Sequence, residues 1–296
     1  MTVCKVAPVG VLTPMSLDEA LATLSEQPEA LLLAGGTDLM VEINEGRHHV
    51  PDDERIIAVG HLPELRTWVH DPDARTLRLG AAVTYAELER APLADLAPAL
   101  AQAARTVGSP QIRNAATIGG NLATCSPAGD GLPVLAALEA MVELRGPDGT
   151  RTLPVHEFMT GVKRTALQPS ELIVAITVPV LDGWQGYAKV GVRNAMVIAI
   201  AGACLAADRP GRSVRLALGS VAPTIVRAAD AEAHALATVD WDADAVTEQD
   251  VVRFGELAAA ATSPISDHRA TAAYRRHAIE VLSRRLLRRA FPNGSA

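Results

Sequence analysis

Between residues 17 and 24, apolar positions recur at the spacing of a helical face, and Ser16 and Glu19 supply the capping box that would open a helix. A short apolar run over 30–34 predicts a strand that ends at the paired glycines 35–36. A further strand is predicted at 55–59. The start of the chain therefore predicts a small β-α-β unit with a tight glycine turn at the end of a strand.

The middle of the chain predicts short helices mixed with short strands. Its helices are expected at 84–90, 93–107 and 132–138, and a glycine turn is expected at 117–122. Its strands are expected at 141–145, 150–154 and 171–178, the first two as a hairpin.

Beyond the segment 181–183 the pattern changes to long apolar strands followed by helices. The strands are expected at 187–193, 196–206 and 213–221, and the helices at 228–236, 247–261 and 267–290. We predict an α+β protein with one domain over 1–182, built from subdomains of about 1–60 and 61–182, and a second over 183–296. The second would be a three-stranded antiparallel sheet with helices on one face.

Length, charge and cysteine content narrow the classes of function. A chain of 296 residues suits about two domains, and its net charge of −7 argues against a nucleic-acid partner. The basic stretch 275–289 has helical spacing and is expected to form a solvated helix face. No signal peptide is evident, and the longest apolar run, 195–207, is shorter than the roughly 20 residues of a membrane span, which predicts a cytoplasmic protein.

The three cysteines, Cys4, Cys125 and Cys204, are far apart, and no Cys-x-x-Cys pair occurs. A metal centre or iron–sulfur cluster within this chain is therefore not expected. Cys125 is expected to be a small buried packing residue rather than a redox thiol. The P-loop, the Rossmann fingerprint, His-Glu-x-x-His and Gly-x-Ser-x-Gly are all absent.

Two glycine segments carry the candidate chemistry. The first consists of Leu32, Leu33, Ala34, Gly35, Gly36, Thr37, Asp38 and Leu39, and the second of Thr117, Ile118, Gly119, Gly120 and Asn121. Glycines permit positive φ and let backbone amides converge on an anion, so two such segments facing each other could hold a pyrophosphate. The alternative is that each pair only makes a tight turn. Asp130, in a glycine-proline turn, could accept hydrogen bonds from ribose or ribityl hydroxyls, or cap the helix that follows, or do both.

These motifs together resemble a known family. Ala-Gly-Gly-Thr-Asp-Leu at 34–39, Pro-Gln-Ile-Arg-Asn-Ala-Ala-Thr-Ile-Gly-Gly-Asn-Leu-Ala at 110–123 and Ser-Pro-Ala-Gly-Asp at 126–130 resemble the FAD-binding medium subunit of the molybdenum hydroxylases. That family includes bacterial xanthine dehydrogenases and aerobic carbon monoxide dehydrogenases. The resemblance covers essentially the whole chain and implies a PCMH-type FAD-binding domain followed by a C-terminal domain of the carbon monoxide dehydrogenase flavoprotein type.

The resemblance also implies roles for single residues. Both glycine segments would hold the FAD pyrophosphate, and Asp130, Ile173 and Lys189 would contact the cofactor. Val107 stands where eukaryotic relatives carry an aromatic residue against the flavin, which leaves open what covers the ring. From the residues alone, Lys189 could equally be an exposed strand lysine. The stretch 267–276 resembles the closing helix of the family, which implies a role in packing or in contact between subunits.

The implied function is electron transfer through FAD, with no catalytic residue and no metal in this chain. Molybdopterin would lie in a large partner subunit and [2Fe-2S] clusters in a small one, in a dimer of heterotrimers. The final acceptor would be NAD⁺ or a quinone-type compound. Two alternatives remain: a self-contained FAD-dependent oxidase of the wider superfamily, and a non-enzymatic binding protein whose glycine turns are structural. The residues name no substrate.

Overall fold

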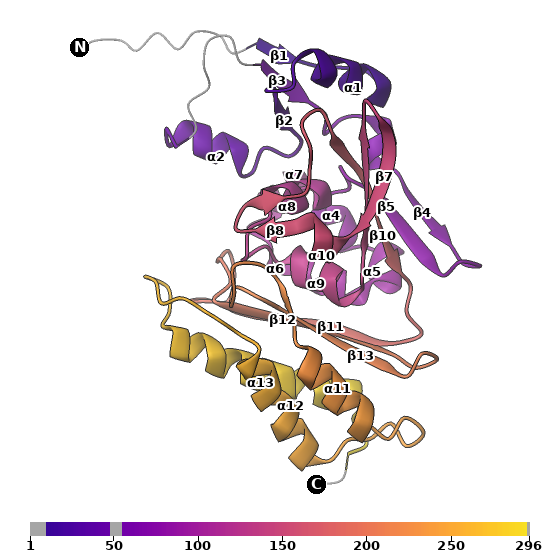
Figure 1. Ribbon diagram of the computed structural model, residues 1–296, viewed down its shortest axis with the longest axis vertical. Helices are drawn as coiled ribbons and strands as arrows, with labels where there is room; N and C mark the ends of the chain where they lie inside the picture. Colours follow the sequence, from indigo (N-terminus) through magenta and orange to yellow (C-terminus); the bar gives the residue numbers. More distant parts are fainter. Residues whose placement is uncertain (1–9, 48–54, 295–296) are drawn as a thin grey trace.

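The computed structural model describes residues 10–47 and 55–294. Its first part is a three-stranded parallel sheet of β1 (Gly10–Leu12), β2 (Leu31–Leu33) and β3 (Arg55–Ala58), in the order β1-β3-β2. Helix α1 (Leu17–Glu26) buries the apolar face that the sequence predicted, and Ser16 accepts from the Glu19 amide at its start. The predicted β-α-β unit is confirmed, and α2 (Leu39–Asn44) stands to one side of it (Figure 1).

The middle part is a five-stranded antiparallel sheet with helices packed against it. Its strands, in spatial order, are β4 (Trp68–Asp71), β5 (Thr76–Gly80), β10 (Leu172–Pro179), β6 (Met141–Gly146) and β7 (Gly149–Pro154). Its helices are α3 (Pro63–Arg66), α4 (Tyr85–Leu88), α5 (Leu93–Leu96), α6 (Pro98–Thr106), α7 (Pro110–Ala115), α8 (Ile118–Thr124), α9 (Gly131–Ala137) and α10 (Val155–Phe158). A short hairpin, β8 (Met159–Gly161) with β9 (Arg164–Thr165), completes it.

Two predicted elements of this middle part differ from the structure. The helix expected over 93–107 is divided into α5 and α6 at Pro98, because proline has no N–H with which to continue the helical ladder. The glycine turn expected over 117–122 is helical: Thr117 caps α8, and Gly119 and Gly120 lie in its first turn. The hairpin of β6 and β7 is confirmed.

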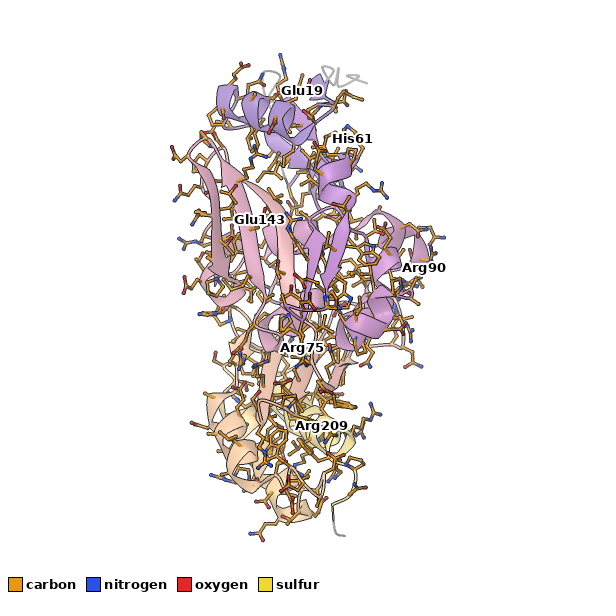
Figure 2. All side chains as sticks on the ribbon, turned by 90° about the vertical axis from the view of Figure 1, so that its right-hand side faces the viewer. Glu19, His61, Arg75, Arg90, Glu143 and Arg209 are labelled. Atoms are coloured by element: carbon orange, nitrogen blue, oxygen red, sulfur yellow. The ribbon has the colours of Figure 1, made fainter. Side chains whose placement is uncertain are left out.

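The C-terminal part is an antiparallel sheet of β11 (Gly183–Val190), β12 (Ala201–Asp208), β13 (Ser213–Gly219) and the two-residue β14 (Val226–Arg227). The sheet therefore has a fourth strand beyond the three predicted. Its helices are α11 (Ala229–Thr238), α12 (Glu248–Ala260) and α13 (Ala272–Ala290). Figures 1 and 2 show the three sheets arranged along the long axis of the molecule, with Arg209 near the end opposite Glu19.

Strand β12 is buried on both faces, which explains its continuous apolar sequence. Cys204 and Ala206 belong to the core of the middle part, whereas Ala203 and Leu205 belong to the core under α11, α12 and α13. Helices α6 and α9 contact β11 and β12 from the side opposite α13. The C-terminal sheet is thus held between two layers of helices, and one of them comes from the middle part.

The strand predicted over 196–206 begins only at Ala201. Met196 has a φ of +50°, and its side chain and that of Ile198 are more than half exposed. The apolar residues before Ala201 therefore leave the sheet and form a loop. That loop faces the cavity described next.

Candidate functional site

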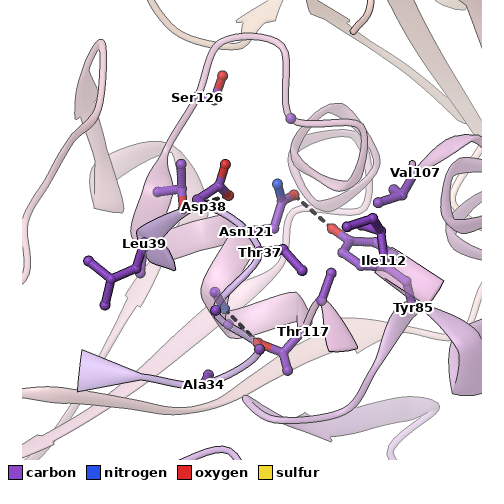
Figure 3. A pocket seen from close by; sticks show the side chains of 18 of the residues that line it. Ala34, Thr37, Asp38, Leu39, Tyr85, Val107, Ile112, Thr117, Asn121 and Ser126 are labelled. Atoms are coloured by element: carbon purple, nitrogen blue, oxygen red, sulfur yellow. Dashed lines mark hydrogen bonds between the residues drawn. The ribbon is translucent and has the colours of Figure 1, made fainter. Parts of the chain in front are cut away.

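A cavity of about 680 Å³ opens where the first sheet, the helices of the middle part and the loop before β12 meet (Figure 3). All but two of the predicted cofactor residues, Ile118 and Lys189, line this cavity. The predicted residues that line it are 32–39, Val107, Thr117, 119–121, Asp130 and Ile173. Ile118 is fully buried in the core, and Lys189 is buried beside the cavity. The fold therefore brings the two glycine segments to one site.

The first glycine segment presents unpaired backbone donors. Gly36 has a φ of +69°, which a side chain would disfavour. Gly35 lies so close to α7 that a Cβ there would be 2.0 Å from the carbonyl oxygen of Ala115. The backbone N–H groups of residues 35–38 donate no hydrogen bond within the described part of the chain. This segment therefore has the properties of an anion-binding loop.

The second glycine segment works differently from the prediction. Its amides are already used: Ile118 N–H donates to Val83, Gly119 N–H to Ala81, and Gly120 N–H to the Thr117 hydroxyl. A Cβ at Gly119 would lie 2.6 Å from that of Ala81. The second pair is therefore not a mirror of the first. Its glycines let α8 approach the middle sheet closely and leave the cavity wall there free of side chains.

Asn121 follows in α8, and its amide is oriented by a buried tyrosine. The Tyr85 hydroxyl donates to Asn121 Oδ1 at 2.7 Å, so Nδ2 is left as a donor at the cavity wall (Figure 3). Burial, with the nearby carboxylates of Asp130 and Asp38, raises the pKa of Tyr85 well above its usual value. The hydroxyl therefore stays protonated and remains a donor.

Asp130 sits in a buried ion pair with Lys189. Lys189 Nζ donates to Asp130 Oδ2 at 2.7 Å and to the carbonyl of Thr106 at 3.1 Å, and the Tyr187 hydroxyl donates to Oδ1 at 2.8 Å. The side chains of Lys189 and Asp130 are 6% and 8% exposed. Burial raises the pKa of Asp130, and the ammonium of Lys189 and the hydrogen bonds oppose it.

Two readings from the sequence are corrected by this ion pair. Asp130 makes no capping hydrogen bond to α9, because its carboxylate is turned toward Lys189 and Tyr187. Lys189 is not an exposed strand lysine. Cys125 is buried, as predicted, and Cys4 lies outside the described residues.

Apolar residues that the sequence analysis did not predict form part of the cavity wall. Ile112 comes from α7, and Met196, Val197 and Ile198 come from the loop before β12. Their signal was available in one respect: the apolar run 195–207 is longer than a typical strand of about 5–6 residues, so part of it had to lie outside the sheet. Val107 lines the same cavity.

The cavity lining contains no lysine, arginine, histidine or cysteine among the described residues; its titratable groups are Asp38, Tyr85 and Asp130. Within this lining, a negatively charged ligand would therefore be held by backbone N–H groups and neutral side-chain donors rather than by cations. The described residues also contain no cluster of three or more histidine, cysteine, aspartate or glutamate side chains suited to a metal ion. No helix in them is long and apolar enough to cross a membrane.

Comparison with known proteins decides the family. The model of the FAD binding domain in molybdopterin dehydrogenase matches residues 7–181, and that of the CO dehydrogenase flavoprotein C-terminal domain matches residues 187–290. The chain belongs to this family. It is 33% identical over 270 residues to the carbon monoxide dehydrogenase medium chain of Hydrogenophaga pseudoflava, with 88% of this chain and 90% of the relative covered.

Other relatives agree in sequence and in structure. The xanthine dehydrogenase FAD-binding subunit of Escherichia coli O157:H7 is 30% identical over 285 residues, which are 92% of each chain. The solved carbon monoxide dehydrogenase from Hydrogenophaga pseudoflava that lacks the Mo-pyranopterin moiety superposes with a TM-score of 0.86, at 31% identity and with 98% of this chain and 100% of that chain covered. The family resemblance seen in the motifs is confirmed, and this chain is an FAD-binding oxidoreductase subunit.

The cavity fits the cofactor of the family. Its volume lies within the range of about 300–1,000 Å³ that is usual for small-molecule sites. The amides of residues 35–38, which have no acceptor within the described residues, suit a pyrophosphate. The hydroxyl and amide side chains of Thr37 and Asn121 suit sugar hydroxyls, and the apolar wall suits a flat ring.

Proposed function

We propose that this chain is the electron-transfer flavoprotein of a molybdenum-containing hydroxylase or dehydrogenase complex. It would take electrons from iron–sulfur clusters in a small partner subunit, with molybdopterin in a large one, and pass them to NAD⁺ or a quinone-type acceptor. Residues 1–182 would carry the cofactor and 183–296 would close the cavity from below. The observation that carries this proposal is the meeting of both glycine segments at one cavity of cofactor size.

The chain's own residues would bind and orient the cofactor rather than act on a substrate. FAD supplies one- and two-electron chemistry when it is bound. Asp130 already shares its oxygen atoms with Lys189 and Tyr187, and Tyr85 is held protonated. The described lining contains no histidine or cysteine that could tether a flavin or relay a proton. These features favour an electron carrier over a self-contained oxidase.

The names of the relatives support placing the choice of substrate in a partner. Chains of similar length and identity are named for carbon monoxide, xanthine and glyceraldehyde dehydrogenases. A single cofactor scaffold therefore serves dehydrogenases of chemically different compounds. We propose the same separation of roles in the complex formed by this chain.

The test is to purify the full chain with the proteins that accompany it and to measure FAD, molybdenum and iron. We expect FAD in equimolar amount with this chain, released into the supernatant by acid, and molybdenum and iron only when the partners are present. Yellow colour that stays on the acid-precipitated chain would favour the oxidase instead. A chain that shows no flavin absorbance after FAD is added would favour a structural role for the glycine segments.

A modest loss of FAD affinity is expected from Tyr85→Phe. The ring keeps its place, but Asn121 loses the hydrogen bond that orients its amide. The loss should be about 1 kcal/mol, or roughly fivefold in the FAD dissociation constant, measured by quenching of flavin fluorescence. The control is Tyr274→Phe, because Tyr274 is 48% exposed on α13.

A double-mutant cycle with Asn121→Ala tests the coupling between the two side chains. If Tyr85 acts through Asn121, the Tyr85→Phe change should have little effect once Asn121 is alanine. Additive losses would show that the two side chains act independently on the cofactor.

A further inference from the structure

Arg275 differs from the other arginines of α13. It is 3% exposed, and the prediction of a solvated basic face is therefore wrong at this position, although Arg276, Arg285, Arg288 and Arg289 are exposed. Its Nη1 donates to the carbonyl of Ile200 at 2.6 Å and to that of Ser220 at 3.0 Å. Its Nη2 donates to Asp267 Oδ1 at 2.8 Å.

The first carbonyl belongs to the base of the cavity loop. Residues 196–198 line the cavity, and Ile200 ends the loop where it joins β12. The Ile200 amide donates to Val190 at the end of β11 at 2.8 Å. The carbonyl of Ile200 is held by Arg275 and its amide by Val190, so the loop leaves the sheet from a fixed point.

The second carbonyl leads to the opposite wall. Ser220 has a φ of +63°, and its amide donates to the carbonyl of Pro127 at 2.8 Å. Pro127 lies in the turn that contributes Ser126, Ala128 and Gly129 to the cavity and ends at Asp130. The guanidinium of Arg275 thus contacts the end of the loop before β12 directly and the turn 126–130 of the middle part through Ser220.

Asp267 fixes the guanidinium in turn. Its Oδ1 also accepts from the amides of Arg269 and Ala270 at 2.9 and 3.2 Å. These backbone hydrogen bonds, with Arg275, lower the pKa of Asp267 to about 2, so the carboxylate is ionised throughout the neutral range. A buried arginine held by a permanent charge is a rigid support rather than a mobile side chain.

We propose that Arg275 is a positioning residue for the FAD site: it ties the loop 196–198 and the turn 126–130 to one point beneath the cavity. The inference rests on the proposed function, since it takes FAD as the ligand. It assigns the 267–276 segment a role beyond packing. The pocket walls would remain folded without Arg275 but would no longer be held at a fixed separation.

The test compares Arg275→Met and Arg275→Lys with wild type in the purified complex. For Arg275→Met we expect FAD to bind roughly tenfold more weakly, the lower end of what loss of supporting contacts costs a ligand site. We also expect the bound flavin to lose the fine structure of its absorbance band and to recover part of its fluorescence. A lysine ammonium is one nitrogen, so it could replace Nη1 at the two carbonyls but not Nη2 at Asp267 as well. Arg275→Lys should therefore fall between Arg275→Met and wild type.

Two controls separate positioning from general destabilisation. Arg276→Met removes an exposed arginine from the same helix and should leave affinity and spectrum unchanged. Leu282→Ala removes a buried side chain from the core of the C-terminal part and should lower the melting temperature without changing the flavin spectrum. Arg275→Met that binds FAD with wild-type affinity and spectrum, or that changes them no more than Leu282→Ala does, would overturn the proposal. Failure of the wild-type complex itself to bind FAD would instead contradict the proposed function.

Discussion

Gly35→Ala should abolish most FAD binding. The new methyl group would be 2.0 Å from the carbonyl oxygen and 2.6 Å from the carbonyl carbon of Ala115, and both belong to the backbone at the end of α7. Because backbone atoms cannot rotate away, the loop 35–38 has to move from the middle part of the protein. We expect a loss of about 3 kcal/mol, the upper end of the usual range for overpacking, or roughly 100-fold in the FAD dissociation constant.

The measurement is a titration of the cofactor-free protein with FAD, followed by flavin fluorescence, with the melting temperature recorded in parallel. Gly46→Ala is the control, because nothing in the described residues lies within 4 Å of the Cβ that it adds; unlike Gly35, Gly46 has a positive φ, of +67°. It should cost about 1–2 kcal/mol of stability through backbone strain and leave FAD affinity unchanged. If Gly35→Ala binds FAD within threefold of wild type, the contact with Ala115 does not set the geometry of the site.

The parts of the fold that were predicted correctly are those decided by neighbours in sequence. A helix is predicted to begin at residue 84, and there Thr84 and Glu87 form a capping box with hydrogen bonds in both directions. The hairpin of β6 and β7 turns at Gly149, whose φ of +107° is available to glycine. Gly36 belongs to the same class, because it needs its positive φ for a local turn, whereas Gly35 is required by the closeness of Ala115, far away along the chain.

The second glycine segment shows the limit of predicting structure from neighbouring residues in the sequence. Paired glycines look alike in sequence, but Gly119 is required by the closeness of Ala81, which lies far away along the chain. Whether the amides of such a pair are free to bind a ligand or already donate hydrogen bonds within the protein depends on what packs against the pair. The residues predicted at this position still line the same cavity as the first glycine segment, although for a different physical reason.

The loop before β12 could not be placed for a related reason. Apolar residues at 196–200 and at 201–207 are equally suited to a buried strand. What ends the strand is its partner: β11 stops at Val190, which pairs with Ala201, so the residues before Ala201 have no strand to pair with. The pairing of Asp130 with Lys189 likewise joins positions 59 residues apart, and only the folded chain shows that each is the other's partner.

The second large effect is expected from Lys189→Met. Lys189 and Tyr187 both donate to the buried carboxylate of Asp130. The substitution removes the ammonium of Lys189 and leaves the hydroxyl of Tyr187. Breaking a buried ion pair by removing one partner costs about 3–5 kcal/mol, because the other charge stays in a poor environment. We therefore expect that loss in the free energy of unfolding near neutral pH, measured by urea denaturation. Lys163→Met is the control, since Lys163 is 53% exposed in its pair with Glu42 and should cost about 1 kcal/mol or less.

The dependence of this loss on pH identifies its cause. Burial raises the pKa of Asp130 and Lys189 opposes the rise, so the variant should have a still higher folded-state pKa. The folded variant then binds more protons than the unfolded chain, and its stability falls as the pH rises from the unfolded carboxyl value of about 3.9 to the folded one. The destabilisation should be smallest in acid and largest at neutral pH. Adding Asp130→Asn should restore much of the loss at neutral pH, because it removes the unpaired charge; a loss that is equal at all pH values and unaffected by Asp130→Asn would mean that packing, not charge, is what Lys189 contributes.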